Sequence, residues 1–217
     1  ASPFVSDIDA LAANALGQGA LSGFVWCDDL AEATGNRRYS DLLVRIADLF
    51  EPRGMEGGGL SEAADTLVED MFHAGVLWGR AYKITGDVSY PDRLASFLLG
   101  SRNQQQDGLF WHSPSTPHYW GRGNGFAALA FAEALTYIPD DHPKRGDVFA
   151  KHVRHLEALR PLQRPSGMFP QLLDSPGSFE EFTSTCQIGY AVARGLRRGW
   201  LDDSYRNLLD RAWRGAS

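Results

Sequence analysis

The feature that most constrains the fold of this chain is a pattern that returns after 51 residues. In each copy a helical stretch ends at a Thr-Gly pair, a tyrosine follows, and a second amphipathic stretch begins. The pairs are Thr34-Gly35 and Thr85-Gly86, and the tyrosines are Tyr39 and Tyr90. Glycine often ends a helix, because it reaches left-handed backbone angles at little cost. The pattern therefore predicts repeated helical hairpins.

Two weaker copies bring the number of predicted hairpins to about four. One has Ile138-Pro139 in place of Thr-Gly, and the other has Gly199 and Tyr205. Helical hairpins that cannot bury their apolar sides alone must stack, either as an open solenoid or as a closed ring. No long run alternates Val, Ile and Thr with polar residues, and no linker divides the chain. We expect one all-α domain over residues 1–217, with minor strand content.

The predicted helices also include one over residues 8–21 and a long one that ends at Thr85. Ser61 is the expected N-cap of the long helix, with Glu62 in its first turn. Loops rich in Gly, Pro and aromatic residues precede the helices that open the later hairpins. They cover residues 51–60, 101–125 and 163–182. Because each loop stands at the same point of the repeat, all three are expected on one side of the molecule.

Composition narrows the classes of function. The chain is 43% apolar, so it can bury a sizeable core, and its net charge of −6 with no Lys/Arg run argues against a nucleic-acid partner. Its apolar runs are too short to span a membrane, and no signal peptide is visible. Cys27 and Cys186 have neither metal nor redox spacing, which favours free thiols and a cytoplasmic location. We expect no cofactor and leave an oligomer open.

The segment from Trp111 to Phe126, WHSPSTPHYWGRGNGF, is the main candidate for a ligand site. Pro114 and Pro117 exclude a continuous helix through its first half, which is therefore a loop. Its second half runs into the Ala-rich FAALAFAEAL, a buried helix by composition. A helix N-terminus attracts anions, and Arg122 adds a full positive charge there. The segment predicts a site for an anionic ligand, which glycine residues would let come close to the backbone.

Acidic residues lie amid apolar residues in the long helix that ends at Thr85. Glu69 and Asp70 stand among Met71, Phe72 and other apolar residues. An acid in a partly apolar cavity has a raised pKa, as a general acid near neutral pH requires. The alternative is that one acid faces water and the other pairs with a base. Adjacent helical side chains point about 100° apart, so only one can face a cavity, and we favour Asp70.

Two further groups of polar residues are weaker candidates. Glu181 is followed by Thr183, Ser184 and Thr185, which could cap a helix or line a polar pocket, and capping is the simpler interpretation. His152 and His155 have a spacing that occurs in metal sites, but no acid or thiol cluster stands nearby. We therefore expect no metal there.

The chain resembles the unsaturated glucuronyl and rhamnogalacturonyl hydrolases, most clearly from about Asp65 to Asp202. Glu69-Asp70-Met71-Phe72 is similar to the family phrase Asp-Asp-Met-Phe, and Trp111-His112 to a Trp-His phrase. Three other sequence motifs of the family have counterparts here. They are at Trp120, Arg122, Asn124 and Phe126, at Gly167, Gln171 and Asp174, and at Glu181-Phe182-Thr183. Phe126 stands where tryptophan is usual. The family's catalytic aspartate can align with Glu69 or with Asp70.

The resemblance implies an (α/α)6 barrel, here an incomplete α/α toroid, since the barrel needs six hairpins and about four are present. The chain could be a fragment of such a barrel, or the ring could be incomplete or completed by another chain. The resemblance also implies an enzyme acting on the 4,5-unsaturated uronic acid that polysaccharide lyases leave on oligosaccharides, by hydration of the double bond. Asp70 or Glu69 would be catalytic. The substrate would contact Trp111, His112, Trp120, Arg122, Asn124, Phe126 and Glu181.

Two alternatives remain open at this stage. The first is another (α/α)-barrel enzyme, such as a sugar epimerase or an inverting glycosidase. An inverting glycosidase would need two separated acids, and Asp70 with Glu181 is the available pair. A degenerate barrel that binds sugar without catalysis is the other.

Overall fold

The computed structural model describes residues 21–56, 59–61 and 64–217. Its α-helices form successive hairpins: α3 (Cys27–Thr34) with α4 (Arg38–Leu49), α5 (Val68–Thr85) with α6 (Ser89–Gly100), α7 (Gly121–Tyr137) with α8 (Arg145–Leu159), and α9 (Phe182–Arg198) with α10 (Arg206–Ala216). Short 3-10 helices are η1 (Ser22–Trp26), η2 (Arg160–Leu162) and η3 (Asp203–Tyr205). The strands β1 (Met55–Glu56) and β2 (Gly59–Leu60) pair antiparallel, as do β3 (Phe169–Pro170) and β4 (Glu180–Glu181). The all-α prediction with minor strand content is confirmed.

The Thr-Gly pairs end helices, as the repeat predicts. Gly35 and Gly86 have φ of 68° and 72°, the left-handed conformation that closes α3 and α5. The threonine before each glycine donates its hydroxyl to the carbonyl four residues back, in Thr34 at 2.5 Å and in Thr85 at 2.8 Å. Gly199 closes α9 in the same way, with φ of 71°. These turns reverse the chain between the two helices of a hairpin.

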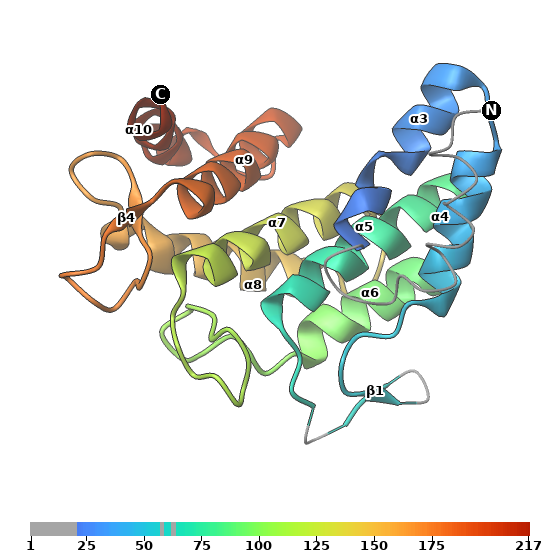
Figure 1. The fold of residues 1–217 in the computed structure, drawn as a ribbon, viewed down its shortest axis with the longest axis horizontal. Helices are drawn as coiled ribbons and strands as arrows, with labels where there is room; N and C mark the ends of the chain where they lie inside the picture. Colours follow the sequence, from blue (N-terminus) through green and yellow to red (C-terminus); the bar gives the residue numbers. More distant parts are fainter. Residues whose placement is uncertain (1–20, 57–58, 62–63) are drawn as a thin grey trace.

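The first helices of the hairpins lie side by side, and the second helices flank them (Figure 1). Helix α5 packs against α7, and α7 packs against α9. Apolar side chains of α4, α5, α6 and α7 form one core, and those of α7, α8, α9 and α10 form a second. Helix α7 contributes to both cores, which explains why its sequence is apolar on nearly all sides. The four hairpins form an arc with α7 near its middle.

The start of α5 differs from the prediction. The helix begins at Val68 and not after Ser61, and Leu67 has extended backbone angles. The preceding residues bond to the next loop: the Thr66 hydroxyl donates to Asn103 Oδ1 at 2.8 Å, and Asp65 Oδ1 accepts from the Ser115 N–H at 2.8 Å. These contacts between loops replace the helical turn. Glu62 and nearly all of the helix expected over residues 8–21 lie outside the described residues.

The loops before α5, α7 and α9 emerge on one side of the arc, as expected (Figure 1). They are also joined to one another. The Val68 N–H donates to the His112 carbonyl at 3.1 Å, and the Leu173 N–H donates to the Tyr119 carbonyl at 2.9 Å. We call this side the loop face; it consists of the described residues in 50–67, 101–120 and 160–181 and the first turns of the three helices. No helix in the described part of the chain is long and apolar enough to cross a membrane.

Candidate functional site

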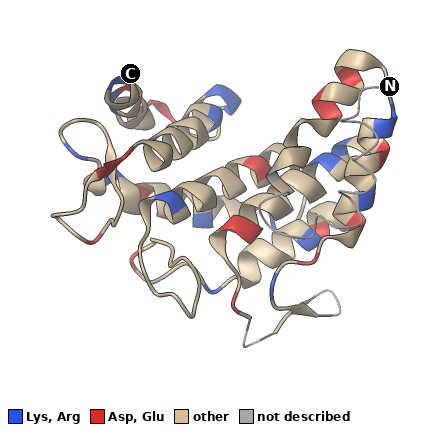
Figure 2. Cartoon of the chain, viewed as in Figure 1, with Lys and Arg blue, Asp and Glu red and all other residues tan. Residues whose placement is uncertain are grey.

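The first turns of α5 and α7 bring opposite charges to the loop face. Glu69 and Asp70 are in the first turn of α5, and Arg122 is the second residue of α7. Figure 2 shows acidic residues at the start of α5 and a basic residue at the start of the neighbouring α7. Helices α5 and α7 pack together along one seam, and Glu69 and Arg122 are both in the first turns of these helices. The sequence-predicted acids and arginine therefore share one surface.

Glu69 faces His112 at this surface. Glu69 Oε2 lies 3.6 Å from His112 Nδ1, and the side chains are 19% and 18% exposed. Both atoms are shielded from solvent, yet neither has a hydrogen-bond partner among the described residues. Unpaired buried polar groups cost free energy and concentrate at sites where a ligand completes the bonding. The Glu69–His112 pair is thus a candidate for contact with a substrate.

Asp70 points away from this pair and into the protein. It is 1% exposed, and its Oδ2 accepts the Leu67 N–H at 3.1 Å, which caps the start of α5. Burial raises the pKa of Asp70, although the hydrogen bond from Leu67 and the charge of Arg53 act in the opposite direction. The two adjacent acids are divided between a surface and an interior position, as the 100° angle requires. The acid that faces the surface is Glu69, whereas the sequence analysis favours Asp70.

Stacked side chains connect His112 to Arg122. The His112 ring lies 5.2 Å from the Trp120 ring, and the Arg122 guanidinium lies 5.2 Å above the same tryptophan. Arg122 is exposed, and none of the ion pairs among the described residues includes it. Contact with the tryptophan ring orients the guanidinium without neutralising it. An anion can therefore bind Arg122 without displacing a protein carboxylate.

Two further predicted residues also lie at or near the surface, each partly exposed. The Phe126 ring lies 5.6 Å from the Phe72 ring, so these side chains bridge α7 and α5 next to Glu69. Trp111 is held by its main chain, whose N–H donates to the Asn103 carbonyl at 2.9 Å. Aromatic surface of this kind suits the apolar face of a sugar ring.

The glycines of the Gly-Arg-Gly-Asn-Gly phrase serve protein packing and not approach to a ligand. A Cβ on Gly121 would lie 2.3 Å from the Pro170 carbonyl oxygen, and a Cβ on Gly125 would lie 2.1 Å from Gln187 Oε1. One on Gly123 would lie 3.3 Å from Val68 Cγ2. The three glycines let α7 approach the loop before α9, α9 itself and the start of α5. The expectation that they leave room for a ligand is replaced by this packing role.

Asn124 belongs to the framework beneath the site. Its side chain is fully buried; Nδ2 donates to the carbonyls of Phe110 and Trp120, each at 2.9 Å, and Oδ1 accepts the Phe110 N–H at 2.9 Å. Oδ1 also accepts from His155 Nε2 at 3.0 Å. An amide with these bonds has no group left for a sugar. The predicted substrate contact of Asn124 does not fit this placement.

Glu181 is used as a helix cap, the simpler of its two sequence interpretations. Its side chain accepts the Ser184 N–H at the start of α9. Helix α7 lies between α5 and α9. Asp70 is buried and caps the start of α5, and Glu181 caps the start of α9, so both carboxylates have capping roles.

His152 and His155, the pair with metal-like spacing, are both fully buried in α8. Burial lowers the pKa of His152 to about 4 and that of His155 to about 3. Their rings pack against aromatic residues, at 5.8 Å from Phe131 and 4.7 Å from Phe110. Across the described ranges, no group of three His, Cys, Asp or Glu side chains could hold a metal ion.

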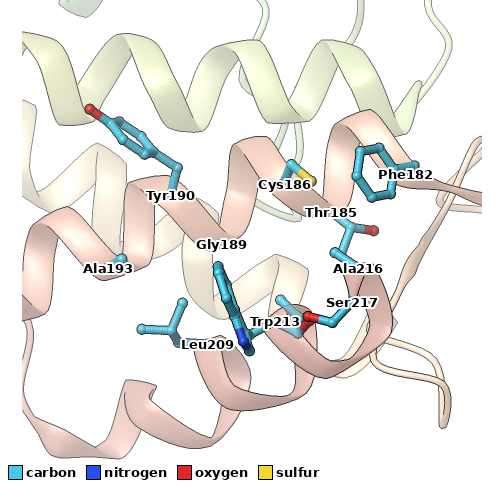
Figure 3. Close-up of a pocket in the computed structure, with 11 residues that line it drawn as sticks. Phe182, Thr185, Cys186, Gly189, Tyr190, Ala193, Leu209, Trp213, Ala216 and Ser217 are labelled. Atoms are coloured by element: carbon cyan, nitrogen blue, oxygen red, sulfur yellow. The ribbon is translucent and has the colours of Figure 1, made fainter.

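Sequence reasoning missed an apolar cavity between α9 and α10 (Figure 3). Its volume is about 380 Å³, and small residues such as Gly189 and Ala212 line it together with the partly exposed Phe182, Tyr190 and Trp213. None of the residues proposed for the site borders it. The spacing of Gly189 and Ala193 in α9 was the available signal, since small residues four apart leave a groove on a helix.

Comparison with known proteins shows what this chain is similar to. Residues 113–217 match the model of Glycosyl Hydrolase Family 88. An unsaturated 3S-rhamnoglycuronyl hydrolase of Alteromonas sp. (strain LOR) is 25% identical over 162 residues, which are 66% of this chain and 38% of that protein. The unsaturated rhamnogalacturonyl hydrolase YesR of Bacillus subtilis (strain 168) is 36% identical over 86 residues, 38% of this chain and 25% of YesR. The chain is therefore similar in sequence to unsaturated uronyl hydrolases.

Solved structures of other glycoside hydrolases superpose on this chain. A glycoside hydrolase of family 105 from C. acetobutylicum ATCC 824 superposes with a TM-score of 0.80 at 20% identity, covering 92% of this chain and 63% of that one. Unsaturated glucuronyl hydrolase from Bacillus sp. GL1 superposes with a TM-score of 0.67 at 15% identity, covering 87% and 58%. The arc of hairpins is therefore part of an (α/α)6-barrel fold. The chain spans about a quarter to two fifths of the length of the curated relatives quoted above.

Proposed function

We propose that this chain carries the acid-bearing part of the active site of an enzyme that removes 4,5-unsaturated uronyl residues from oligosaccharides. Glu69 would donate a proton to C4 of the double bond, and positive charge would develop at C5 and the ring oxygen. The Glu69 carboxylate would then take a proton from water as its hydroxyl adds to C5. The resulting hemiketal opens to a ketone at C5, and the hemiacetal left at C1 releases the next sugar.

The observation that carries this proposal is the placement of Glu69 and Arg122 at matching positions across the α5–α7 seam. Eleven residues further along each helix, at about three turns, Arg80 and Glu133 occupy the corresponding positions and pair at 2.6 Å. At the loop face, Glu69 faces His112 and Arg122 stacks on Trp120. The seam thus offers an acid and a guanidinium that a ligand can bridge.

The chemistry of an unsaturated uronate suits such a bridge. Its carboxylate is attached to C5, next to the C4 that must be protonated. An arginine that grips the carboxylate with its two parallel N–H groups would place C4 within a few ångströms, on the side of Glu69. Trp111, Trp120 and Phe126 would contact the sugar ring. The substrate partner is accordingly an oligosaccharide, and the free thiols Cys27 and Cys186 fit a cytoplasmic location.

The assay that tests the proposal follows the ultraviolet absorbance of the conjugated enol carboxylate in lyase-generated disaccharides. We expect the absorbance to fall with pectin-derived or glycosaminoglycan-derived substrates. A disaccharide of the corresponding saturated sugars should release no additional reducing sugar. An unchanged absorbance with both substrate classes would contradict the proposed hydration. Isothermal calorimetry with the same disaccharide then identifies a non-catalytic sugar-binding barrel, which gives heat without turnover.

A further inference from the structure

A buried amide joins the two loops that carry the candidate acid and its histidine. Asn103 is 0% exposed, and its Nδ2 donates to the carbonyls of Thr66 at 2.9 Å, His112 at 3.2 Å and Trp111 at 3.3 Å. Its Oδ1 accepts the hydroxyls of Thr66 and Ser101, each at 2.8 Å. Hydroxyl donors on one side and carbonyl acceptors on the other fix the orientation of the amide. Two N–H hydrogens serve three carbonyls, so its donor capacity is exhausted.

The groups that Asn103 holds are the main chains beside the reacting side chains. Thr66 lies three residues before Glu69, and the His112 carbonyl that Asn103 binds also accepts the Val68 N–H at 3.1 Å. The backbones that carry Glu69 and His112 are therefore bonded both to each other and to one buried amide. Their side chains meet at 3.6 Å without a hydrogen bond of their own. Nothing in that side-chain contact itself fixes the separation, so the backbone must.

We propose that Asn103 is a positioning residue, which sets the separation of the Glu69 carboxylate from the His112 imidazole and thereby aims the acid at the substrate. Asn103 acts through these residues and touches no substrate. The kinetic part of the test rests on the proposed function. The geometric part does not.

A matched control exists at the next loop. Gln163 is 7% exposed, and its Nε2 donates to the carbonyls of Gly167 at 2.9 Å and Leu208 at 3.0 Å, which ties the loop before α9 to α10. It is also a buried amide that bridges main-chain carbonyls, but it contacts neither Glu69 nor His112. Asn103→Leu keeps the branched outline of the side chain, Gln163→Met keeps its length, and both remove the donors. Both variants should lose stability, because buried carbonyls are left unpaired.

Kinetics separate positioning from stability. For Asn103→Leu we expect kcat to fall about 10- to 100-fold with KM changed less than about threefold, since a displacement of about 1 Å can cost that much rate. Gln163→Met should keep kcat within about twofold, with a comparable loss of unfolding free energy. Equal kcat values for the two folded variants would overturn the proposal. If Asn103→Leu does not fold, Thr66→Val removes one orienting hydroxyl and should lower kcat about two- to fivefold; an unchanged kcat would again overturn it.

A spectroscopic measurement tests the same idea without any turnover. Replacing Glu69 by Gln should shift the NMR signal of the His112 ring, because the charge removed lies 3.6 Å away. In the Asn103→Leu or Thr66→Val background, the shift caused by Glu69→Gln should be smaller by about a fifth or more, since a displacement of about 1 Å lengthens the 3.6 Å contact and Coulomb interaction falls with distance. An equal shift in both backgrounds overturns the positioning role. A silent hydration assay with a reduced shift would refute the proposed function and leave the positioning role standing.

Discussion

The charged residues at the two ends of α5 and α7 are arranged differently. At the loop face, Glu69 and Arg122 have no ion pair with each other, and Glu69 and His112 meet without a hydrogen bond. At the other end, a series of alternating charges crosses four helices, which we call the far-end ladder: Asp28 of α3, Arg80 of α5, Glu133 of α7 and Arg194 of α9. Arg80 bonds to Asp28 at 3.1 Å and to Glu133 at 2.6 Å.

The two ends can be compared because the same two helices, α5 and α7, carry charged residues at the same spacing at both ends. Glu69 and Arg80 are eleven residues apart on α5, and Arg122 and Glu133 are eleven apart on α7, so each pair shares one face of its helix at roughly 16 Å separation. Opposite charges across this seam can pair directly, as the far-end ladder shows. At the loop face they do not pair: the Arg122 guanidinium lies over the Trp120 ring, and Glu69 faces His112. The ion pairs account for the charges at the paired end, and the proposed substrate would account for the unpaired charges at the loop face.

The largest expected effect comes from removing the unpaired acid. Glu69→Gln should lower kcat about 10²- to 10⁴-fold or more, as expected for loss of a general acid, with little change in unfolding free energy. Asp70→Asn is the matched control: it keeps a side-chain oxygen for the Leu67 N–H and should leave kcat nearly unchanged. Steady-state kinetics and urea unfolding of both variants provide the measurement. A kcat loss confined to Asp70→Asn would return the catalytic role to Asp70.

Substitution in the far-end ladder should lower the unfolding free energy and leave kcat nearly unchanged. Glu133→Gln leaves two buried cations, Arg80 and Arg194, without their shared carboxylate. Breaking a buried ion pair in this way costs about 3–5 kcal/mol of unfolding free energy. Because the ladder is three helical turns from Glu69, kcat of the folded variant should be close to that of the parent. Asp203→Asn, which breaks the exposed pair with Arg206, should cost no more than about 1 kcal/mol.

A large loss of kcat in folded Glu133→Gln would break the comparison, since it would make the far end part of the catalytic machinery. Differential scanning calorimetry and kinetics at a temperature well below unfolding distinguish the two results. Exchange of both charges, with Arg80→Glu and Glu133→Arg combined, is a weaker test because Asp28 and Arg194 would then face like charges.

Acid should weaken the fold through the buried histidines. Burial lowers the pKa of His152 to about 4, below the ordinary value of 6.5, so the unfolded chain binds a proton that the native chain does not. The unfolding free energy therefore falls as pH drops from about 6.5 towards 4, by at most about 1.4 kcal/mol per pH unit for this histidine. His155, whose pKa burial lowers to about 3, adds a similar slope.

His152→Leu isolates this contribution. Neither ring nitrogen of His152 has a hydrogen-bond partner among the described residues, so the substitution removes no bond. Between pH 7 and pH 5, urea unfolding should show a loss of stability that is smaller by about 2 kcal/mol in the variant than in the parent. An identical pH dependence in the two proteins would show that His152 is protonated, or hydrated, in the native state.

The sequence predicts the features of this fold that depend on near neighbours. The Thr-Gly turns are local, because the Thr34 hydroxyl bonds four residues back and Gly35 needs only its own backbone angles. The common side of the three loops follows from their place in the repeat. The division of Glu69 and Asp70 between two environments follows from helix geometry.

The features that sequence reasoning placed wrongly depend on contacts between distant segments. Thr66 and Asn103 are 37 residues apart, and their hydrogen bond belongs to the loop contacts that delay the start of α5. Asn124 and His155 are 31 residues apart, and that contact buries an amide which the motif alone suggests for substrate. The choice of Glu69 over Asp70 likewise depends on His112 in another loop. Patterns of residue type do not contain these pairings.

The smallest effect that we expect concerns how Arg122 grips an anion. Arg122→Lys keeps the positive charge at the start of α7 but loses the planar fork that binds a carboxylate with two hydrogen bonds, and it weakens the stacking on Trp120. We expect KM for an unsaturated disaccharide to rise about tenfold, equivalent to about 1.4 kcal/mol, with kcat changed less. Arg102→Lys, in the loop before α7, serves as a control and should leave KM unchanged. If Arg122→Lys instead lowers kcat as strongly as Glu69→Gln, the arginine aligns the double bond with the acid and does more than bind it. If it changes neither constant, the carboxylate binds elsewhere on the loop face, and the unpaired charge of Arg122 needs another explanation.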